Sequence, residues 1–206
     1  MSTGLTPESS LESSSEARLA FRRALRQQAI ERRLALSAAE CTRHSATICA
    51  LLDQHFPQLA HWHVGFCWPV NNEPDLRPLI TSWLARGEAG FSALLPLVQG
   101  LDQPLAFREW TPRSSMQADR FGIPTPTTGR LLRPQALLIP VNAFDGAGYR
   151  IGYGGGFFDR TLASLQPAPL AIGVGFELAR VESVRPEAHD VRLSAMVSEA
   201  GVFMHS

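Results

Sequence analysis

The chain has 206 residues with no formal net charge at neutral pH, and 45% of its residues are hydrophobic. This size and composition favour one globular domain with a sizeable core, and the charge balance gives no general electrostatic attraction to nucleic acid. All nineteen basic residues are arginines, which excludes a Walker site, a kinase site or a Schiff-base site built on lysine.

Three cysteines, Cys41, Cys49 and Cys67, form no CxxC pair, so we expect neither a disulfide framework nor a structural zinc site. The first twenty residues lack a basic-then-apolar signal, and no apolar stretch approaches the roughly twenty residues of a membrane span. We therefore expect a cytoplasmic protein without a membrane span or a nucleic-acid partner.

The chain opens with residues 1–15, which are small, polar and rich in serine and are predicted to form a disordered lead-in. Residues 16–36 contain neither glycine nor proline and predict a long helix. Ser37 is the predicted N-cap of a second helix that runs to about His55, because Glu40 three residues later completes a capping box.

Strands and helices then alternate along the chain. Apolar runs predict strands over 61–68, 89–98, 104–110, 135–141 and 170–176, whereas the last segment is too mixed to assign and holds only a candidate short strand at 193–199. Helices are predicted over 75–87, where Gly87 ends the helix, and over 157–165, and residues 111–134 read as an irregular, proline-rich loop. This alternation predicts an α/β fold: an open, mostly parallel sheet with helices on both faces, in a single domain over 16–206 with N-terminal helices, and ligands at the carboxyl ends of the strands.

The segment GYRIGYGGGFFDR, residues 148–160, holds five glycines between a predicted strand and a predicted helix. Glycine N–H groups and a helix N-terminus together favour binding of a phosphate. The spacing matches neither GxGxxG nor the lysine-containing P-loop. Arg150 can supply positive charge to such a site and Asp159 can hold magnesium. The alternative is a tight turn in which Arg150 and Asp159 pair only with each other.

A row of arginines lies on the first predicted helix. Arg18, Arg22 and Arg26 are four residues apart, so they share one face, with Arg23 beside them. Because arginine binds phosphate oxygens through a planar fork, the row suits a polyphosphate. A solvated helix face is the alternative.

Trp68 and Glu73 follow the strand predicted over 61–68, where open sheets bind ligands. An aromatic ring and a carboxylate suit a flat, nitrogen-rich heterocycle, because its N–H groups donate to a carboxylate. The alternative is a tryptophan at the sheet edge and a glutamate on the surface.

Residues 139–163, IPVNAFDGAGYRIGYGGGFFDRTLA, resemble the long signature of 5-formyltetrahydrofolate cyclo-ligases, also called methenyltetrahydrofolate synthetases. The likeness extends over most of the chain and includes RRALR at 22–26, RRLALS at 32–37, Glu73, Gly122–Ile123 and His189–Asp190. It implies a ligase with ATP as co-substrate and Mg²⁺ as cofactor. The enzyme would convert 5-formyltetrahydrofolate to 5,10-methenyltetrahydrofolate and release ADP and phosphate.

The resemblance also implies roles for individual residues. Catalysis would use Arg150 and Glu73. ATP would contact arginines and residues of the glycine-rich segment, namely Arg22, Arg23, Arg26, Arg150, Gly152, Gly154, Gly155, Gly156 and Phe158. The reduced folate would contact Trp68, Glu73, Tyr153 and Phe157, and the magnesium ion would be held by Asp159 and Asp190. The γ-phosphoryl group would be transferred to the formyl oxygen, after which N10 of the folate attacks the activated carbon.

Some positions depart from the family pattern. Arg22 replaces a lysine, Phe158 a tyrosine, Thr125 a glutamate, Ser194 an aspartate and Gln135 an aspartate. These departures motivate an alternative, a non-catalytic protein of the same fold that binds nucleotide or folate. A sugar-phosphate or CoA-ester enzyme on an open sheet is a further hypothesis that depends on fold analogy alone. We expect a monomer whose partners are small-molecule substrates.

Overall fold

The computed structural model describes residues 7–205, with side chains from residue 15 onward. The α-helices are α1 (Pro7–Leu34), α2 (Ala38–His55), α3 (Arg77–Arg86) and α4 (Phe157–Ser164), and the 3-10 helices are η1 (Pro57–His61) and η2 (Glu177–Ala179). The strands are β1 (His63–Gly65), β2 (Ser92–Leu97), β3 (Ala106–Glu109), β4 (Met116–Ala118), β5 (Pro124–Pro126), β6 (Ala136–Pro140), β7 (Ala143–Phe144), β8 (Arg150–Ile151), β9 (Leu170–Val174), β10 (Ala195–Ser198) and β11 (Gly201–Met204).

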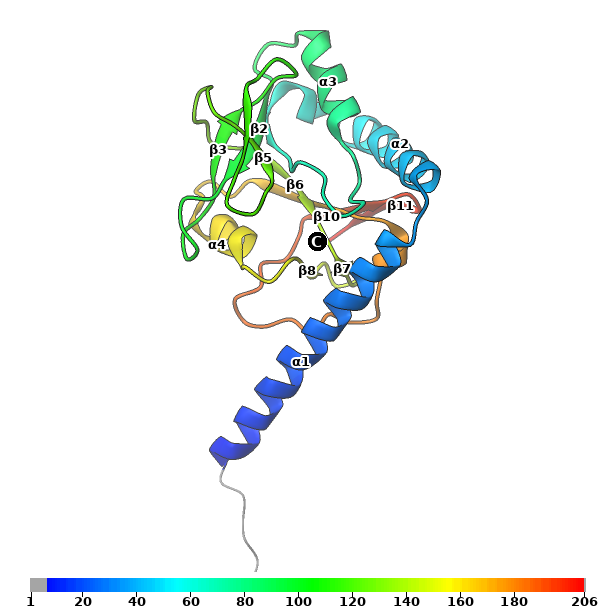
Figure 1. Ribbon diagram of the computed structural model, residues 1–206, viewed down its shortest axis with the longest axis vertical. Coiled ribbons are helices and arrows are strands. Elements are labelled where there is room, and N and C mark those ends of the chain that lie inside the picture. Colours follow the sequence, from blue (N-terminus) through cyan, green and yellow to red (C-terminus); the bar gives the residue numbers. More distant parts are fainter. Residues whose placement is uncertain (1–6, 206) are drawn as a thin grey trace, which may run out of the picture.

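One large sheet forms the centre of the molecule (Figure 1). Its seven strands lie in the order β11-β10-β9-β6-β1-β2-β3. The five inner strands pair in parallel, and only the two edge strands, β3 and β11, run antiparallel to their neighbours. The predicted fold class, an open and mostly parallel sheet, is confirmed.

Helices cover both faces of this sheet, as predicted. Side chains alternate between the two faces along a strand. In β6, Leu138 packs into the core beneath α2 and α3, whereas Leu137 and Ile139 pack into a second core with Leu162 of α4. The two cores make the sheet a rigid platform for the loops at its carboxyl edge.

The predicted helix ends are well defined. Ser37 caps α2 through a capping box, since its side chain accepts the N–H of Glu40 while the Glu40 carboxylate accepts the N–H of Ser37. Gly87 ends α3 with a positive φ of 66°, a conformation that glycine adopts without a steric penalty.

Several elements differ from the prediction. Helix α1 begins at Pro7 rather than Glu16, so it includes residues 7–15 of the predicted lead-in, while residues 1–6 lie outside the described residues. Proline suits the first turn of a helix because its missing N–H has no partner there. The loop predicted over 111–134 contains the hairpin β4–β5. The short strands β7 and β8, and the edge strand β11, were not predicted because two to four residues give too little periodicity to detect.

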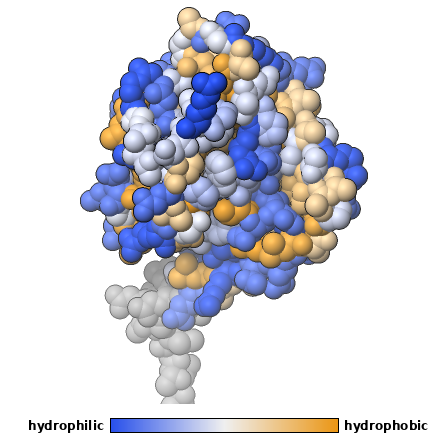
Figure 2. Space-filling model, turned by 45° about the horizontal axis from the view of Figure 1, so that its top comes forward, coloured by the Kyte–Doolittle hydropathy of each residue, from blue (hydrophilic) through white to orange (hydrophobic). Residues whose placement is uncertain are grey.

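Helix α1 extends well beyond the sheet at one end of the molecule (Figure 1). No helix between residues 7 and 205 is long and apolar enough to cross a membrane. On the face shown in Figure 2, hydrophilic and hydrophobic residues are interspersed.

Candidate functional site

The site begins with a turn that follows β6 at the carboxyl edge of the sheet. Strands β7 and β8 form a small hairpin there, and the buried side chain of Asp145 shapes its turn. Asp145 Oδ1 accepts the N–H groups of Ala147 and Tyr149, each at 3.1 Å, and Oδ2 accepts that of Val184 at 3.0 Å. Asp145 therefore fixes the turn between β7 and β8 and joins it to Val184.

The glycine loop, residues 152–156, connects β8 to α4. Gly154 and Gly156 have positive φ values of 95° and 64°, and Gly156 is the N-cap of α4. A Cβ at Gly154 would lie 3.1 Å from the guanidinium of Arg26, whereas a Cβ at Gly152 would have no described atom within 4 Å. The loop thus packs against α1 at Gly154 and leaves open space beside Gly152.

Arg150 and Asp159 lie at the two ends of this loop and form an ion pair of 2.9 Å. Arg150 is buried, and its other terminal nitrogen donates to the carbonyl of Val191 at 2.8 Å. The N–H of Val191 in turn donates to Asp159 at 3.0 Å. In this structure Arg150 and Asp159 pair with each other, which was the alternative to phosphate binding in the sequence analysis.

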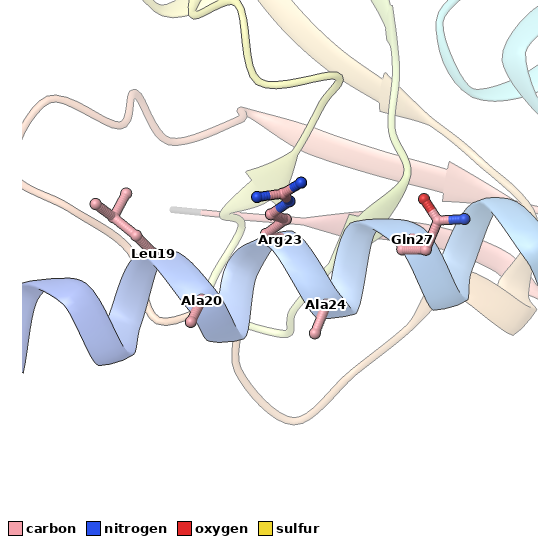
Figure 3. Close-up of a pocket in the computed structure, with 5 residues that line it drawn as sticks. All are labelled: Leu19, Ala20, Arg23, Ala24 and Gln27. Atoms are coloured by element: carbon pink, nitrogen blue, oxygen red, sulfur yellow. The ribbon is translucent and has the colours of Figure 1, made fainter.

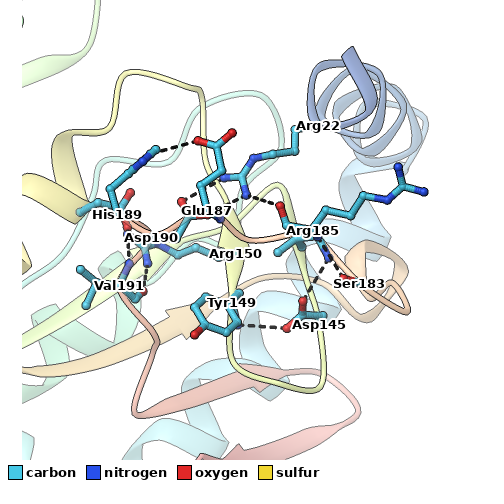
Figure 4. Close-up of polar contacts among 12 residues, drawn as sticks. Arg22, Asp145, Tyr149, Arg150, Ser183, Arg185, Glu187, His189, Asp190 and Val191 are labelled. Carbon is cyan, nitrogen blue, oxygen red and sulfur yellow. Dashed lines mark hydrogen bonds and ion pairs between the residues drawn. The ribbon is translucent and has the colours of Figure 1, made fainter. Parts of the chain in front are cut away.

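A second ion pair attaches α1 to the segment before β10 (Figure 4). Arg22 donates to both carboxylate oxygens of Asp190, at 2.7 and 3.0 Å, and Asp190 also accepts the N–H of Glu187. The Arg185 guanidinium lies 4.0 Å from the centre of the Phe21 ring on the same helix. Residues 185–190 are therefore held directly beside the arginines of α1.

Arg26 contacts the glycine loop itself, because its Nε donates to the carbonyl of Gly152 at 2.7 Å. Burial, and then the neighbouring Arg22 and Arg23, lower the pKa of Arg26. Arg23 lies in an open pocket along α1 with Leu19, Ala20, Ala24 and Gln27 (Figure 3). Arg22 thus contacts the segment before β10, Arg26 contacts the glycine loop, and Arg23 lies on an open surface.

A buried polar cluster lies on the other side of the glycine loop, around Arg33. Arg33 donates to the carbonyl of Asn71 at 2.7 Å, to Asn142 Oδ1 at 2.8 Å and to the Tyr153 hydroxyl at 2.9 Å. Its guanidinium also lies 3.9 Å from Oε1 of Glu73. Arg33, for which no role was predicted, therefore contacts both Glu73 and Tyr153, two of the predicted folate-binding residues.

Glu73 is almost fully buried in this cluster. Burial raises the pKa of its carboxyl, and the charge of Arg33 opposes that effect. Burial, and then the charge of Glu73, also raise the pKa of the Tyr153 hydroxyl. The sequence held one signal for Arg33, since it lies seven residues after Arg26 and so on nearly the same face of α1.

The predicted aromatic contacts lie around the same end of the sheet. Trp68 is half-buried, with its ring 6.2 Å from that of Trp110 and 4.6 Å from the guanidinium of Arg77. The ring centre of Phe157 lies 6.1 Å from that of the exposed Phe121 in the β4–β5 connection. Phe157 and Phe158 both pack against the core beneath α4.

Two carboxylates were predicted to hold magnesium. Among the described side chains, no group of three or more His, Cys, Asp or Glu residues could hold a metal ion. Both oxygens of Asp190 accept from Arg22, whereas Asp159 uses only Oδ1 for the hydrogen bonds made by residues 15–205. Mg²⁺ is usually held by one or two carboxylates together with substrate phosphates, so Asp159 fits that ion and Asp190 would first have to exchange Arg22.

Sequence comparison relates the chain to known proteins. Residues 18–199 match the model of the 5-formyltetrahydrofolate cyclo-ligase family. A 5-formyltetrahydrofolate cyclo-ligase from Escherichia coli K12 is 32% identical over 140 residues, which cover 65% of this chain and 75% of the relative. The cyclo-ligase of Haemophilus influenzae is 29% identical over 138 residues, or 64% of this chain and 72% of the relative.

Solved structures agree with this relationship. The NMR structure of 5,10-methenyltetrahydrofolate synthetase from Aquifex aeolicus superposes with a TM-score of 0.76 at 27% identity, covering 89% of this chain and 92% of that one. A 5,10-methenyltetrahydrofolate synthetase from Mycoplasma pneumoniae has the same fold, with a TM-score of 0.70 at 20% identity over 86% of this chain and 98% of that one.

Proposed function

The chain is an enzyme of the 5-formyltetrahydrofolate cyclo-ligase family, and we propose that it uses ATP and Mg²⁺ to convert 5-formyltetrahydrofolate to 5,10-methenyltetrahydrofolate. ADP and phosphate are the other products. The observation that carries the proposal is the glycine loop, which contacts Arg26 through Gly152, follows the buried Arg150, and contacts through Tyr153 the guanidinium of Arg33 beside the buried Glu73.

The arginine side suits ATP. The loop offers backbone N–H groups next to the N-terminus of α4, and Arg26 is already in contact with the loop. Arg22 and Arg23 add positive charge along the same helix. We infer that a phosphate group replaces Asp159 as the partner of Arg150, which releases the Asp159 carboxylate. This exchange reconciles the ion pair with the predicted roles of both residues.

The reaction itself explains the need for ATP. A formamide oxygen is a poor leaving group, so the γ-phosphoryl group is first transferred to it and ADP is released. N10 then forms a bond to the formyl carbon, the carbon–oxygen bond breaks, and phosphate leaves. Phosphoryl transfer depends mainly on positioning and on neutralisation of charge, which arginines and backbone amides provide without a covalent nucleophile. Mg²⁺ held by Asp159, and by Asp190 as predicted, would neutralise charge on the phosphates.

The Glu73 side suits the folate. Its carboxylate can accept N–H groups of the pterin ring, and Trp68, Tyr153 and Phe157 supply aromatic surface for a flat heterocycle. Arg33 keeps a positive charge 3.9 Å from the Glu73 carboxylate and so favours its ionised form. The glycines between the two sides leave room for both substrates to meet.

The test is to incubate purified protein with 5-formyltetrahydrofolate, ATP and Mg²⁺ and to follow the near-ultraviolet absorbance of the methenyl product. We expect absorbance that appears only when all three are present. A folded protein that gives no ATP-dependent absorbance would refute the proposal.

The non-catalytic alternative has no support from the comparisons, since the family and the relatives that the chain matches are cyclo-ligases. Calorimetric binding of ATP or folate without turnover would support it, and efficient turnover excludes it. The monomeric state and the cytoplasmic location remain predictions.

A further inference from the structure

Two buried polar atoms next to Arg33 have no hydrogen-bond partner. Glu73 Oε1 and Asn142 Nδ2 are both shielded from solvent, and neither is hydrogen-bonded to any residue described between 15 and 205. The Tyr153 hydroxyl lies close enough to influence the pKa of Glu73, but the contact lacks the geometry of a hydrogen bond. An unpaired buried polar group destabilises the folded protein. Such groups in a native protein call for an explanation.

The orientation of the Asn142 amide follows from its neighbour. Arg33 has only N–H donors, and its Nη1 lies 2.8 Å from Asn142 Oδ1, so the carbonyl end of the amide must face the guanidinium. Asn142 Nδ2 is therefore the free end, with two N–H groups and no acceptor. Asn142 is 1% exposed, and its own N–H donates to the carbonyl of Ile151, which fixes its backbone.

The two free atoms have opposite hydrogen-bonding character. Glu73 Oε1 is an acceptor and Asn142 Nδ2 is a donor, and one guanidinium contacts both side chains. We propose that Glu73 and Asn142 form a recognition pair for the pterin ring of the reduced folate, with Arg33 as the positioning residue that holds the pair. This inference depends on the proposed function, because it names how the folate side of that site selects its ligand.

The chemistry of the ring matches the pair. A pterin carries N–H donors at N3 and at the 2-amino group, and a carbonyl oxygen at C4 beside N3. Glu73 accepts from the N–H groups, and Asn142 donates to the C4 oxygen. A site built to hydrogen-bond a ligand group discriminates strongly against an analogue that lacks it, because the buried protein group is then left unpaired.

Tyr153 lies at the solvent side of this cluster. Its hydroxyl accepts from Arg33 at 2.9 Å and from Asn71 at 3.3 Å, while the residue as a whole is 48% exposed. It lies between Gly152 and Gly154, whose backbones turn easily. Tyr153 therefore joins the exposed glycine loop to the buried guanidinium that holds the pair.

The experiment measures ligand selectivity without ATP. Calorimetry compares 5-formyltetrahydrofolate with its 4-amino analogue on the unmodified protein and on Asn142→Asp. The analogue presents a donor in place of the C4 oxygen and an acceptor in place of the N3–H, so the change in preference between the two proteins reports on Asn142. The aspartate still offers one oxygen to Arg33 but replaces the amide donor by an acceptor. We expect the unmodified protein to prefer the 4-oxo ligand by about tenfold or more, and Asn142→Asp to narrow or reverse that preference.

The role of Arg33 is tested by the pH dependence of folate binding. The groups that face Glu73 are Arg33 from α1, Tyr153 from the glycine loop, and Cys67 and the N–H of Val70 from its own connection. Arg33→Gln removes the only positive charge among them, which raises the pKa of Glu73 further. The loss of folate affinity on acidification, here called the acid limb, should therefore begin at a higher pH. Arg32→Gln, an exposed neighbour on the same helix, is the matched control and leaves the limb in place.

The outcomes separate this inference from the proposed function. An unchanged 4-oxo to 4-amino preference in Asn142→Asp, with normal turnover by the unmodified protein, would overturn the recognition pair alone. An acid limb that stays in place in Arg33→Gln would overturn the role of Arg33. An unmodified protein that binds no 5-formyltetrahydrofolate would overturn both proposals.

Discussion

Asp159 accepts hydrogen bonds from Arg150 and from the N–H of Val191 through one and the same oxygen, Oδ1. Its second oxygen takes no hydrogen bond from the part of the chain that the structure describes. Asp159 thus holds the end of the glycine loop to residue 191 and still has an oxygen for a cation. These two tasks can be separated by substitution.

Asp159→Asn should separate them. The asparagine carbonyl can still accept from Arg150 and Val191, but the buried Arg150 loses its opposite charge, so we expect the free energy of unfolding to fall by about 1–3 kcal/mol. Loss of the negative charge should lower turnover by about a hundredfold or more and raise the Mg²⁺ concentration needed for half-maximal rate. The methenyl absorbance assay with a Mg²⁺ titration measures both. An unchanged Mg²⁺ requirement would remove Asp159 from the metal site.

The Arg22–Asp190 ion pair should behave as one unit in stability. Arg22→Gln and Asp190→Asn each leave a mostly buried partner unpaired, so we expect each to lower the free energy of unfolding by about 1–3 kcal/mol. The double variant should lose less than the sum of the two. Urea unfolding measures all three, with Arg23→Gln, an exposed neighbour, as control. Strict additivity would show that the pair is not coupled.

Gly152→Ala tests whether the open space beside the loop is used by a ligand. No described atom lies within 4 Å of the added methyl group, so the folded protein should tolerate it with a change in melting temperature of no more than a few degrees. If the phosphates approach the backbone closely there, ATP affinity should fall by about tenfold or more. Calorimetry with ATP measures the effect.

Two further glycines provide the comparison for Gly152. Gly146→Ala, an exposed turn position with equal space, should change neither stability nor ATP affinity. Gly154→Ala should harm both, because its φ is 95° and the methyl group would press on Arg26 at 3.1 Å. Normal ATP affinity in Gly152→Ala would mean that the phosphates bind elsewhere.

The pH dependence of folate binding should report on Glu73. Burial raises the pKa of this carboxyl, so its ionised form is lost at a pH above the ordinary glutamate range. Folate affinity should therefore decline as pH falls through that raised pKa. Calorimetry across mildly acidic pH measures it, and Glu73→Gln, which has no carboxyl to titrate, should show weak binding without this decline.

The contribution of Glu73 to the free energy of unfolding depends on pH in the opposite direction to folate affinity. Because the pKa of Glu73 is higher in the folded than in the unfolded chain, protonation favours the folded state. Its contribution to stability rises as pH falls through the folded-state pKa and levels off below the unfolded value. Thermal melts in this pH window distinguish loss of a carboxylate from unfolding.

Local signals in the sequence predicted the elements that local chemistry determines. The Ser37–Glu40 capping box and the turn at Gly87 depend on residues a few positions apart, and both are confirmed. The parallel sheet followed from the alternation of apolar strands with helices. The hairpin β4–β5 was missed, because each of its strands is only three residues long and carries no alternating pattern.

The site was harder to predict where contacts are distant in sequence. The glycine loop, Arg22, Arg26 and Glu73 were all expected to matter, and a pair between Arg150 and Asp159 was one of the two alternatives, but nothing local indicated that Arg22 pairs with Asp190. Arg33 and Asn142 are 109 positions apart, and neither predicts the other. Which buried polar atoms remain unpaired follows only from the folded arrangement.

The contact between Arg22 and Asp190 joins positions separated by 168 residues. A ribosome extends the chain at about 5–20 residues per second, so α1 waits several seconds before the segment with Asp190 leaves the exit tunnel. During that interval the arginines of α1 have no carboxylate partner at residue 190, and the glycine loop is not yet joined to residue 191. The nascent chain can therefore complete the site only after residues 190 and 191 have left the exit tunnel, and a pause in translation before residue 190 would lengthen the time for which α1 is exposed.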